Sequence, residues 1–145
     1  MSEKELETMI RDAIKLHGHL GPFLVIGVRM GAIANRILCP AHIRSNSLQV
    51  TVRLPLRTPY SCVLDGIQST TKCTIGNQRL KVEDSQEEIT AEFTVQGSNK
   101  TLRISTSPRI IGEIENEFSE GATNEQIAAK IASAREDRLF ELKRQ

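Results

Sequence analysis

The chain has 145 residues, which is enough for a single domain with its own apolar core. Its 19 basic and 18 acidic side chains nearly cancel, so no strong field favours a nucleic acid or an anionic membrane as partner. With no Trp, one Tyr and four Phe, the composition suggests neither a base-stacking platform nor an aromatic sugar site.

The N-terminus has neither the basic start nor the apolar segment of a secretory signal, and we expect a cytoplasmic protein. The longest apolar stretch, residues 22–38, is interrupted by Arg29 and Arg36, so no membrane span is predicted. In a reducing compartment the three cysteines favour free thiols, metal thiolates or catalytic sulfur over a structural disulfide.

Two helices are expected in the N-terminal part of the chain. Ser2 and Glu5 form a capping-box pattern, and apolar residues then recur at helical spacing up to Gly18. Pro22 suits the first turn of a second helix, which the Cys39–Pro40 pair ends. Residues 17–21 are therefore predicted to form a tight corner between two helices.

Gly27 and Gly31 lie four residues apart in the second predicted helix and share one of its faces. Small residues there allow another backbone to approach closely. Together with the apolar terminal helices, this face predicts a homodimer.

Strand patterns occupy the middle of the chain. Residues 48–54 alternate between apolar and polar side chains, and a short helix is expected between residues 58 and 74. Three more strands are expected at residues 79–83, 88–95 and 101–105, followed by helices after Pro108 and after the capping box at 123–126. This order predicts an α+β fold, with an antiparallel sheet of about four strands packed against N-terminal and C-terminal helices.

The first chemical candidate is the pair His17 and His19 at the predicted corner. Gly18 frees the backbone between them, so two imidazoles can converge on one ion or substrate. The alternative is that these histidines only stabilise the end of the first helix.

The second candidate is Cys62 with Cys73, ten residues apart in a spacing unlike a zinc knuckle. Buried structural cysteines are the alternative, because free cysteine is often buried. Cys39 and His42 also have ligand-like spacing, but a helix-end pair without a ligand role is the simpler interpretation. Either one replaces a missing ligand only if the fold brings it close to His17.

Four short sequence blocks occur together in this chain. They are His-Gly-His-Leu-Gly-Pro at 17–22, Val-Ile-Gly-Val-Arg-Met-Gly at 25–31, Cys-Val-Leu-Asp-Gly-Ile-Gln at 62–68 and Lys-Cys-Thr-Ile-Gly at 72–76. In order and separation these blocks resemble the FmdE family, which is named for a component of formylmethanofuran dehydrogenase. The resemblance covers residues 5–106 of a single domain, 1–145, and residues 107–145 match only in being helical. Some members also carry a C-terminal zinc ribbon, which is absent because no cysteine follows Cys73.

The resemblance implies an α+β core, often dimeric, with a metal near the first motif and the middle cysteines. Carried over to this chain, it implies zinc or iron as the metal and the ligands His17, His19, Cys62 and Cys73. Cys62 and Asp65 are the catalytic candidates, and Gln68 is a cofactor-binding candidate. Asp65 and Gln68 can instead orient a ligand histidine, or simply cap and solvate their helix.

Two positions depart from the family pattern. Gly21 stands where the family has cysteine, and residues 76–79 read Gly-Asn-Gln-Arg instead of Gly-Lys-Gly-Asn. The loss of the thiol removes a soft ligand or a nucleophile, and it leaves a mixed imidazole and thiolate set with an open, water-filled position.

The leading hypothesis is a cytoplasmic metal-binding protein linked to molybdenum- or tungsten-dependent one-carbon metabolism such as methanogenesis. One alternative is a thiol-dependent enzyme in which Cys62 or Cys73 attacks and a histidine acts as base. Another is a non-catalytic subunit that binds a small molecule or assembles with the subunits of an oxidoreductase complex. The sequence leaves open whether the protein is an enzyme.

Overall fold

The computed structural model describes residues 1–39 and 47–145 as an α+β fold, as the sequence predicts. Its elements, in chain order, are α1 (Glu3–His17), α2 (Pro22–Leu38), β1 (Leu48–Leu54), α3 (Cys62–Thr71), β2 (Leu80–Asp84), β3 (Thr90–Val95), β4 (Thr101–Thr106), α4 (Pro108–Ser119), α5 (Asn124–Ser133), α6 (Glu136–Leu139) and β5 (Phe140–Arg144).

The sheet has five strands in the order β2-β1-β3-β4-β5. Three of its four pairings are antiparallel, but β1 and β2 run parallel, with Val52 opposite Val82. The connection between these two strands contains α3, and a parallel pair requires such a crossover. The expected antiparallel sheet of about four strands is thus extended by one strand and contains one parallel pair.

Strand β5 differs from the expectation that residues 107–145 are helical. Three helices do occupy most of this segment, but Phe140–Arg144 pairs antiparallel with β4, with Phe140 opposite Thr106. Phe140 is buried and Glu141 is exposed, which is the alternation of an edge strand with one wet face. The C-terminal residues therefore complete the sheet.

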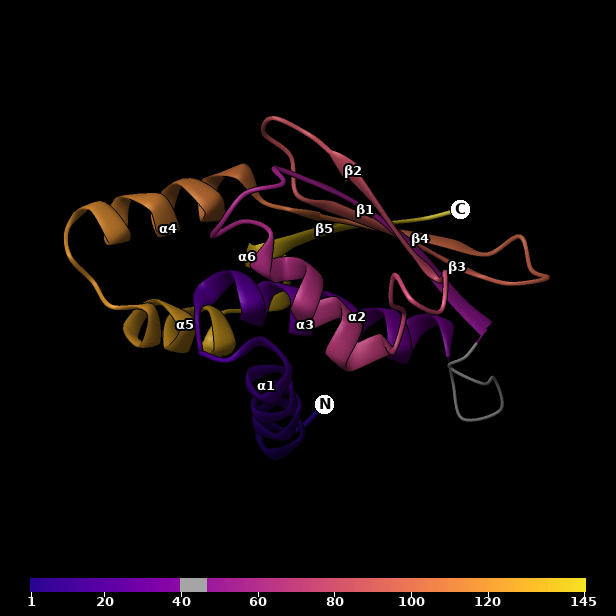
Figure 1. Cartoon of the computed structure of the whole chain (residues 1–145), viewed down its shortest axis with the longest axis horizontal. Helices are drawn as coiled ribbons and strands as arrows, with labels where there is room; N and C mark the ends of the chain where they lie inside the picture. The colour runs from indigo at the N-terminus through magenta and orange to yellow at the C-terminus, as the bar shows by residue number, and fades with distance from the viewer. Residues whose placement is uncertain (40–46) are drawn as a thin grey trace.

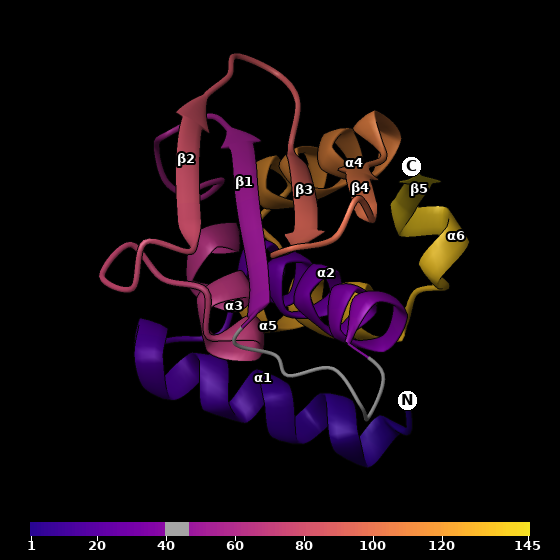
Figure 2. The same ribbon diagram turned by 90° about the vertical axis from the view of Figure 1, so that its right-hand side faces the viewer.

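The helices cover one face of the sheet, and the opposite face carries polar side chains (Figure 1). Figure 2 shows α2 and α3 under the strands and α1 beyond them, on the side away from the sheet. A separate apolar cluster joins α1 to α2 through Ala13, Leu24 and Val28. Helix α2 is thus buried on two sides, which explains why it is apolar almost all round. No helix in the described ranges combines the length and apolar character needed to cross a bilayer.

Helices α2 and α3 meet through glycine. A Cβ atom on Gly27 would lie 2.1 Å from the carbonyl oxygen of Val63, and one on Gly66 would lie 2.4 Å from that of Leu24. Gly31 faces Thr70 in the same way. The close approach predicted for the Gly27 face therefore occurs within the chain, and a homodimer, which stays a prediction, would use another surface.

Candidate functional site

The corner between α1 and α2 positions the two histidines. Gly18 adopts a left-handed backbone with φ of 105°, and its N–H donates to the carbonyl of Ile14 over 2.7 Å, which ends α1. Glycine adopts this conformation without steric cost. His17 is the last residue of α1, His19 follows the turn, and the centroids of their rings lie 4.6 Å apart.

Helix α3 holds the ring of His17. Its Nδ1 atom lies 2.6 Å from Oδ2 of Asp65, while Nε2 of Gln68 donates to Oδ1 of the same carboxylate over 3.1 Å. The Nε2 atom of His17 is buried and has no hydrogen-bond partner. When Nδ1 carries the proton and donates it to Asp65, Nε2 of the neutral ring presents a bare lone pair.

A pocket of about 540 Å³ opens beside this corner. His19 and Cys62 form its polar side, and much of its remaining wall is apolar or aromatic, with Phe23, Tyr60 and Phe118. The rings of Phe23 and Tyr60 meet edge to face at a centroid distance of 5.1 Å. The hydroxyl of Tyr60 donates to the carboxylate of Glu115, which raises the pKa of Tyr60.

The residues of this wall come from separate parts of the chain, so no local motif reveals them. They lie on the α1–α2 corner, the start of α2, the segment before α3, the start of α3, and helices α4 and α5. Sequence reasoning found His19 and Cys62, but it missed Phe23, Tyr60 and Phe118.

Cys62 begins α3 and lines the pocket. Burial raises the pKa of its thiol, and the negative charge of Asp65, one turn further along the helix, raises it again. Without a bound metal, this thiol is therefore mostly protonated at neutral pH. That property disfavours the alternative in which Cys62 is an activated nucleophile.

Cys73 lies away from the other predicted ligands. It follows the opposite end of α3, whose ten residues separate the two thiols by about 15 Å along the axis. The Cys73 thiol is buried, donates to the carbonyl of Leu48 over 3.2 Å, and has a pKa raised by burial. Its negative form also raises the pKa of Cys39, after the larger effect of burial, which places Cys39 at this far end as well. His42 lies outside the described residues.

The structure thus brings together His17, His19 and Asp65, with Cys62 and Gln68 nearby on the same helix face. Within residues 1–39 and 47–145, no three histidine, cysteine or acidic side chains are already grouped as a metal site. The two imidazoles and the unpartnered Nε2 of His17 nevertheless suit a metal ion. A complete set would need a changed position of the Cys62 side chain or a donor from a bound molecule.

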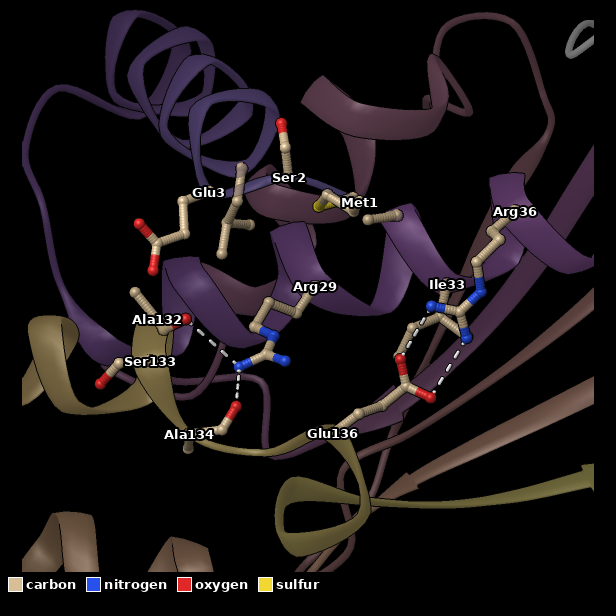
Figure 3. A pocket seen from close by; sticks show the side chains of 12 residues that line it. Met1, Ser2, Glu3, Arg29, Ile33, Arg36, Ala132, Ser133, Ala134 and Glu136 are labelled. Carbon is tan, nitrogen blue, oxygen red and sulfur yellow. Dashed lines mark hydrogen bonds and ion pairs between the residues drawn. The ribbon is translucent and has the colours of Figure 1, made fainter.

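A second pocket, of about 310 Å³, lies between α2, the N-terminus and the end of α5. Figure 3 shows that Arg29 spans it and donates to the carbonyls of Ala132 and Ala134. Arg36 and Glu136 form a two-toothed ion pair at its rim, at 3.0 and 3.1 Å. Because carbonyls at a helix end lack partners within the helix, Arg29 fastens α5 to α2, and this pocket has a structural explanation.

Comparison with known proteins supports the family seen in the sequence motifs. Residues 16–144 match the family described as "FmdE, Molybdenum formylmethanofuran dehydrogenase operon". The match extends beyond residue 106, where the visible motif resemblance ends, and includes β5.

Two relatives are informative. A crystal structure of an FmdE-like protein of the tungsten formylmethanofuran dehydrogenase type, from Syntrophus aciditrophicus, aligns with a TM-score of 0.69 and 21% identity, over 97% of this chain and 71% of that one. A "Probable S-adenosyl-L-methionine-binding protein" of Archaeoglobus fulgidus is 33% identical over 78 residues, or 54% of this chain. The matched region is only 21% of that protein's length. The match over nearly the whole chain shows that this protein belongs to the FmdE family.

Proposed function

We propose that the chain binds one zinc or iron ion through His17, His19 and Cys62, at the mouth of the 540 Å³ pocket. Membership of the FmdE family and the FmdE-like fold suggest a role linked to formylmethanofuran dehydrogenase. The wider proposal is a cytoplasmic protein of molybdenum- or tungsten-dependent one-carbon metabolism, which binds a small molecule or a component of an oxidoreductase complex.

The observation that carries the metal proposal is the state of the His17 ring. Its Nδ1 is bonded to a carboxylate, while its Nε2 is buried without a partner. A carboxylate bonded to one nitrogen orients a metal-ligating histidine and makes the other nitrogen more basic. An unsatisfied buried nitrogen is otherwise costly, so a partner for Nε2 gives this arrangement a purpose.

Cys73 is left out of the proposed ligand set because of its position. Its thiol already donates to Leu48, and α3 separates it from His17. Cys62 stays in the set because it lines the pocket together with His19. Metal binding would deprotonate this thiol despite its raised pKa, since a thiolate is the form that coordinates a metal.

The second candidate is a small-molecule-binding protein without a resident metal. The observation that favours it is the apolar pocket itself, whose 540 Å³ lies within the range of about 300–1,000 Å³ for small-molecule sites. The Archaeoglobus fulgidus relative bears the name of a protein that binds S-adenosyl-L-methionine, which supports an organic ligand for this pocket.

The decisive experiment is elemental analysis of the untagged protein, followed by cobalt(II) substitution, on wild type, His17→Ala, Cys62→Ser and Cys73→Ser. We expect about one ion per chain, lost in His17→Ala. The sulfur-to-cobalt absorption should disappear in Cys62→Ser and persist in Cys73→Ser. If all four proteins are folded and wild type binds no stoichiometric metal, the metal proposal fails. If the absorption disappears only in Cys73→Ser, the proposed ligand set is wrong.

A further inference from the structure

Aromatic side chains are concentrated at the pocket beside His19. The chain has only five, one Tyr and four Phe. Three of them, Phe23, Tyr60 and Phe118, line this pocket, while Phe93 and Phe140 belong to the core. The composition of the sequence suggests no stacking platform, but the fold gathers one from α2, α4 and the segment before α3.

The aromatic wall is held in place before any ligand arrives. Phe23 is buried and packs against Tyr60, whose hydroxyl is bonded to Glu115. The guanidinium of Arg57 lies over the Tyr60 ring, 5.0 Å from its centre. Fixed rings lower the entropic cost of binding a flat molecule.

The amide of Asn124 adds a polar group to this wall. Asn124 is the first residue of α5 and lines the pocket, and its side chain makes no hydrogen bond within the described chain. A Cβ atom at Gly21 would lie 3.1 Å from its Oδ1 atom, so the glycine leaves this amide unhindered. A primary amide presents a donor and an acceptor side by side, and this pattern matches the edge of an amino-substituted heterocycle.

The charges of the lining restrict the ligand further. No lysine or arginine is among the described residues that line this pocket, and its one carboxylate belongs to Glu115. A phosphate or a carboxylate would therefore find no fixed cation here. An uncharged ring system, or one that carries a positive charge, is favoured.

We infer that this pocket binds a planar aromatic heterocycle of the purine nucleoside class, stacked on the aromatic wall and hydrogen-bonded at its edge by Asn124. The inference rests on the proposal that the pocket binds a small molecule, and it names the ligand class and the residue that reads it. The bound ring lies beside His19 and Cys62, so an attached group reaches the same site.

The test is a nitrogen-15 NMR titration of the full chain with adenosine, in metal-loaded and chelator-treated protein. The side-chain NH₂ signal of Asn124, identified by its absence in Asn124→Asp, should shift on addition of adenosine. Stacking contributes about 1–3 kcal/mol per base, so Phe118→Ala should weaken binding by about 5-fold to 150-fold. Asn124→Asp should also weaken it, and this change favours folding because acidic residues suit the first turn of a helix.

The matched control is Asn99→Asp, in the exposed turn between β3 and β4, which should leave adenosine binding unchanged. Cyclohexanol is the comparison probe, because it is apolar but neither flat nor aromatic. If cyclohexanol shifts the pocket signals and adenosine does not, the heterocycle inference is overturned and the small-molecule proposal stands. If neither probe binds, both fail. Adenosine binding that survives in both Phe118→Ala and Asn124→Asp also overturns the inference.

Discussion

The imidazole of His17 and the carboxylate of Asp65, 48 positions apart in the chain, meet at 2.6 Å and join the end of α1 to α3. This contact fixes the orientation of the His17 ring and decides which of its nitrogens is free. Gln68 holds the carboxylate from the other side, so a chain of amide, carboxylate and imidazole leads to Nε2.

Replacement of Asp65 by asparagine should weaken metal binding without removing a ligand. Loss of the carboxylate that orients a ligating histidine typically costs about 10-fold to 100-fold in affinity. Competition with a chromophoric chelator measures this change. Asp12→Asn, at an exposed position of α1, is the matched control and should keep the wild-type affinity. Equal affinities in the two variants would contradict the role assigned to Asp65.

The thiol of Cys62 should react slowly with iodoacetamide in metal-free protein at neutral pH. Its pKa is raised first by burial and then by Asp65, so the reactive thiolate is scarce below the usual range and increases as pH rises. Asp65→Asn removes the negative charge and should speed alkylation at about pH 8, near the usual thiol pKa, as measured by mass spectrometry of the Cys62 peptide. Rapid alkylation of wild type at neutral pH would instead favour the thiol-dependent enzyme.

Gly27→Ala should destabilise the protein by about 3 kcal/mol or more, because overpacking against backbone cannot be relieved by a side-chain rotation. The new Cβ would lie 2.1 Å from the carbonyl oxygen of Val63. The intrinsic preference of a helix for alanine, about 1 kcal/mol, is too small to compensate.

Urea denaturation measures this loss, and Gly112→Ala in α4 is its control. Nothing lies within 4 Å of a Cβ at Gly112. Alanine there should stabilise the protein by about 0.5–1 kcal/mol. The account of the α2–α3 contact is wrong if the two substitutions have similar effects.

Arg29→Met should cost about 2–3 kcal/mol, since hydrogen bonds from a charged donor contribute more than neutral ones. The substitution frees the carbonyls of Ile131 and Ala134 at the end of α5 (Figure 3). Arg36→Met removes an exposed ion pair with Glu136 and should cost less than about 1 kcal/mol. Hydrogen exchange should show faster opening of α5 in Arg29→Met only.

The helix starts were predictable because their signals are local. Ser2 accepts a hydrogen bond from the amide of Glu5, and Thr123 and Gln126 form the full capping box that starts α5. The alternation from Leu48 to Leu54 also gives the buried and wet faces of β1 correctly. Caps and periodicity act over a few residues, so they can be read without knowledge of the fold.

Features that depend on distant pairing were not predictable in the same way. Strand β5 forms only because Phe140 and its neighbours meet β4, and five residues after three helices carry too little pattern to show this. The distance between Cys62 and Cys73 depends on the length of α3, and the sequence spacing alone does not state it. The pocket is assembled from several elements, so Asn124 carried no signal of its own.

The contact at Gly27 and Gly66 has a consequence for how this protein can evolve. Helices α2 and α3 touch through main-chain atoms, so their separation does not depend on which apolar side chains fill the rest of the core. Helix α2 carries Phe23 just after the histidine corner, and α3 carries Cys62 and Asp65. Substitutions at positions such as 21 and 124 can therefore exchange one chemistry for another, while the frame that holds the reacting groups keeps its dimensions.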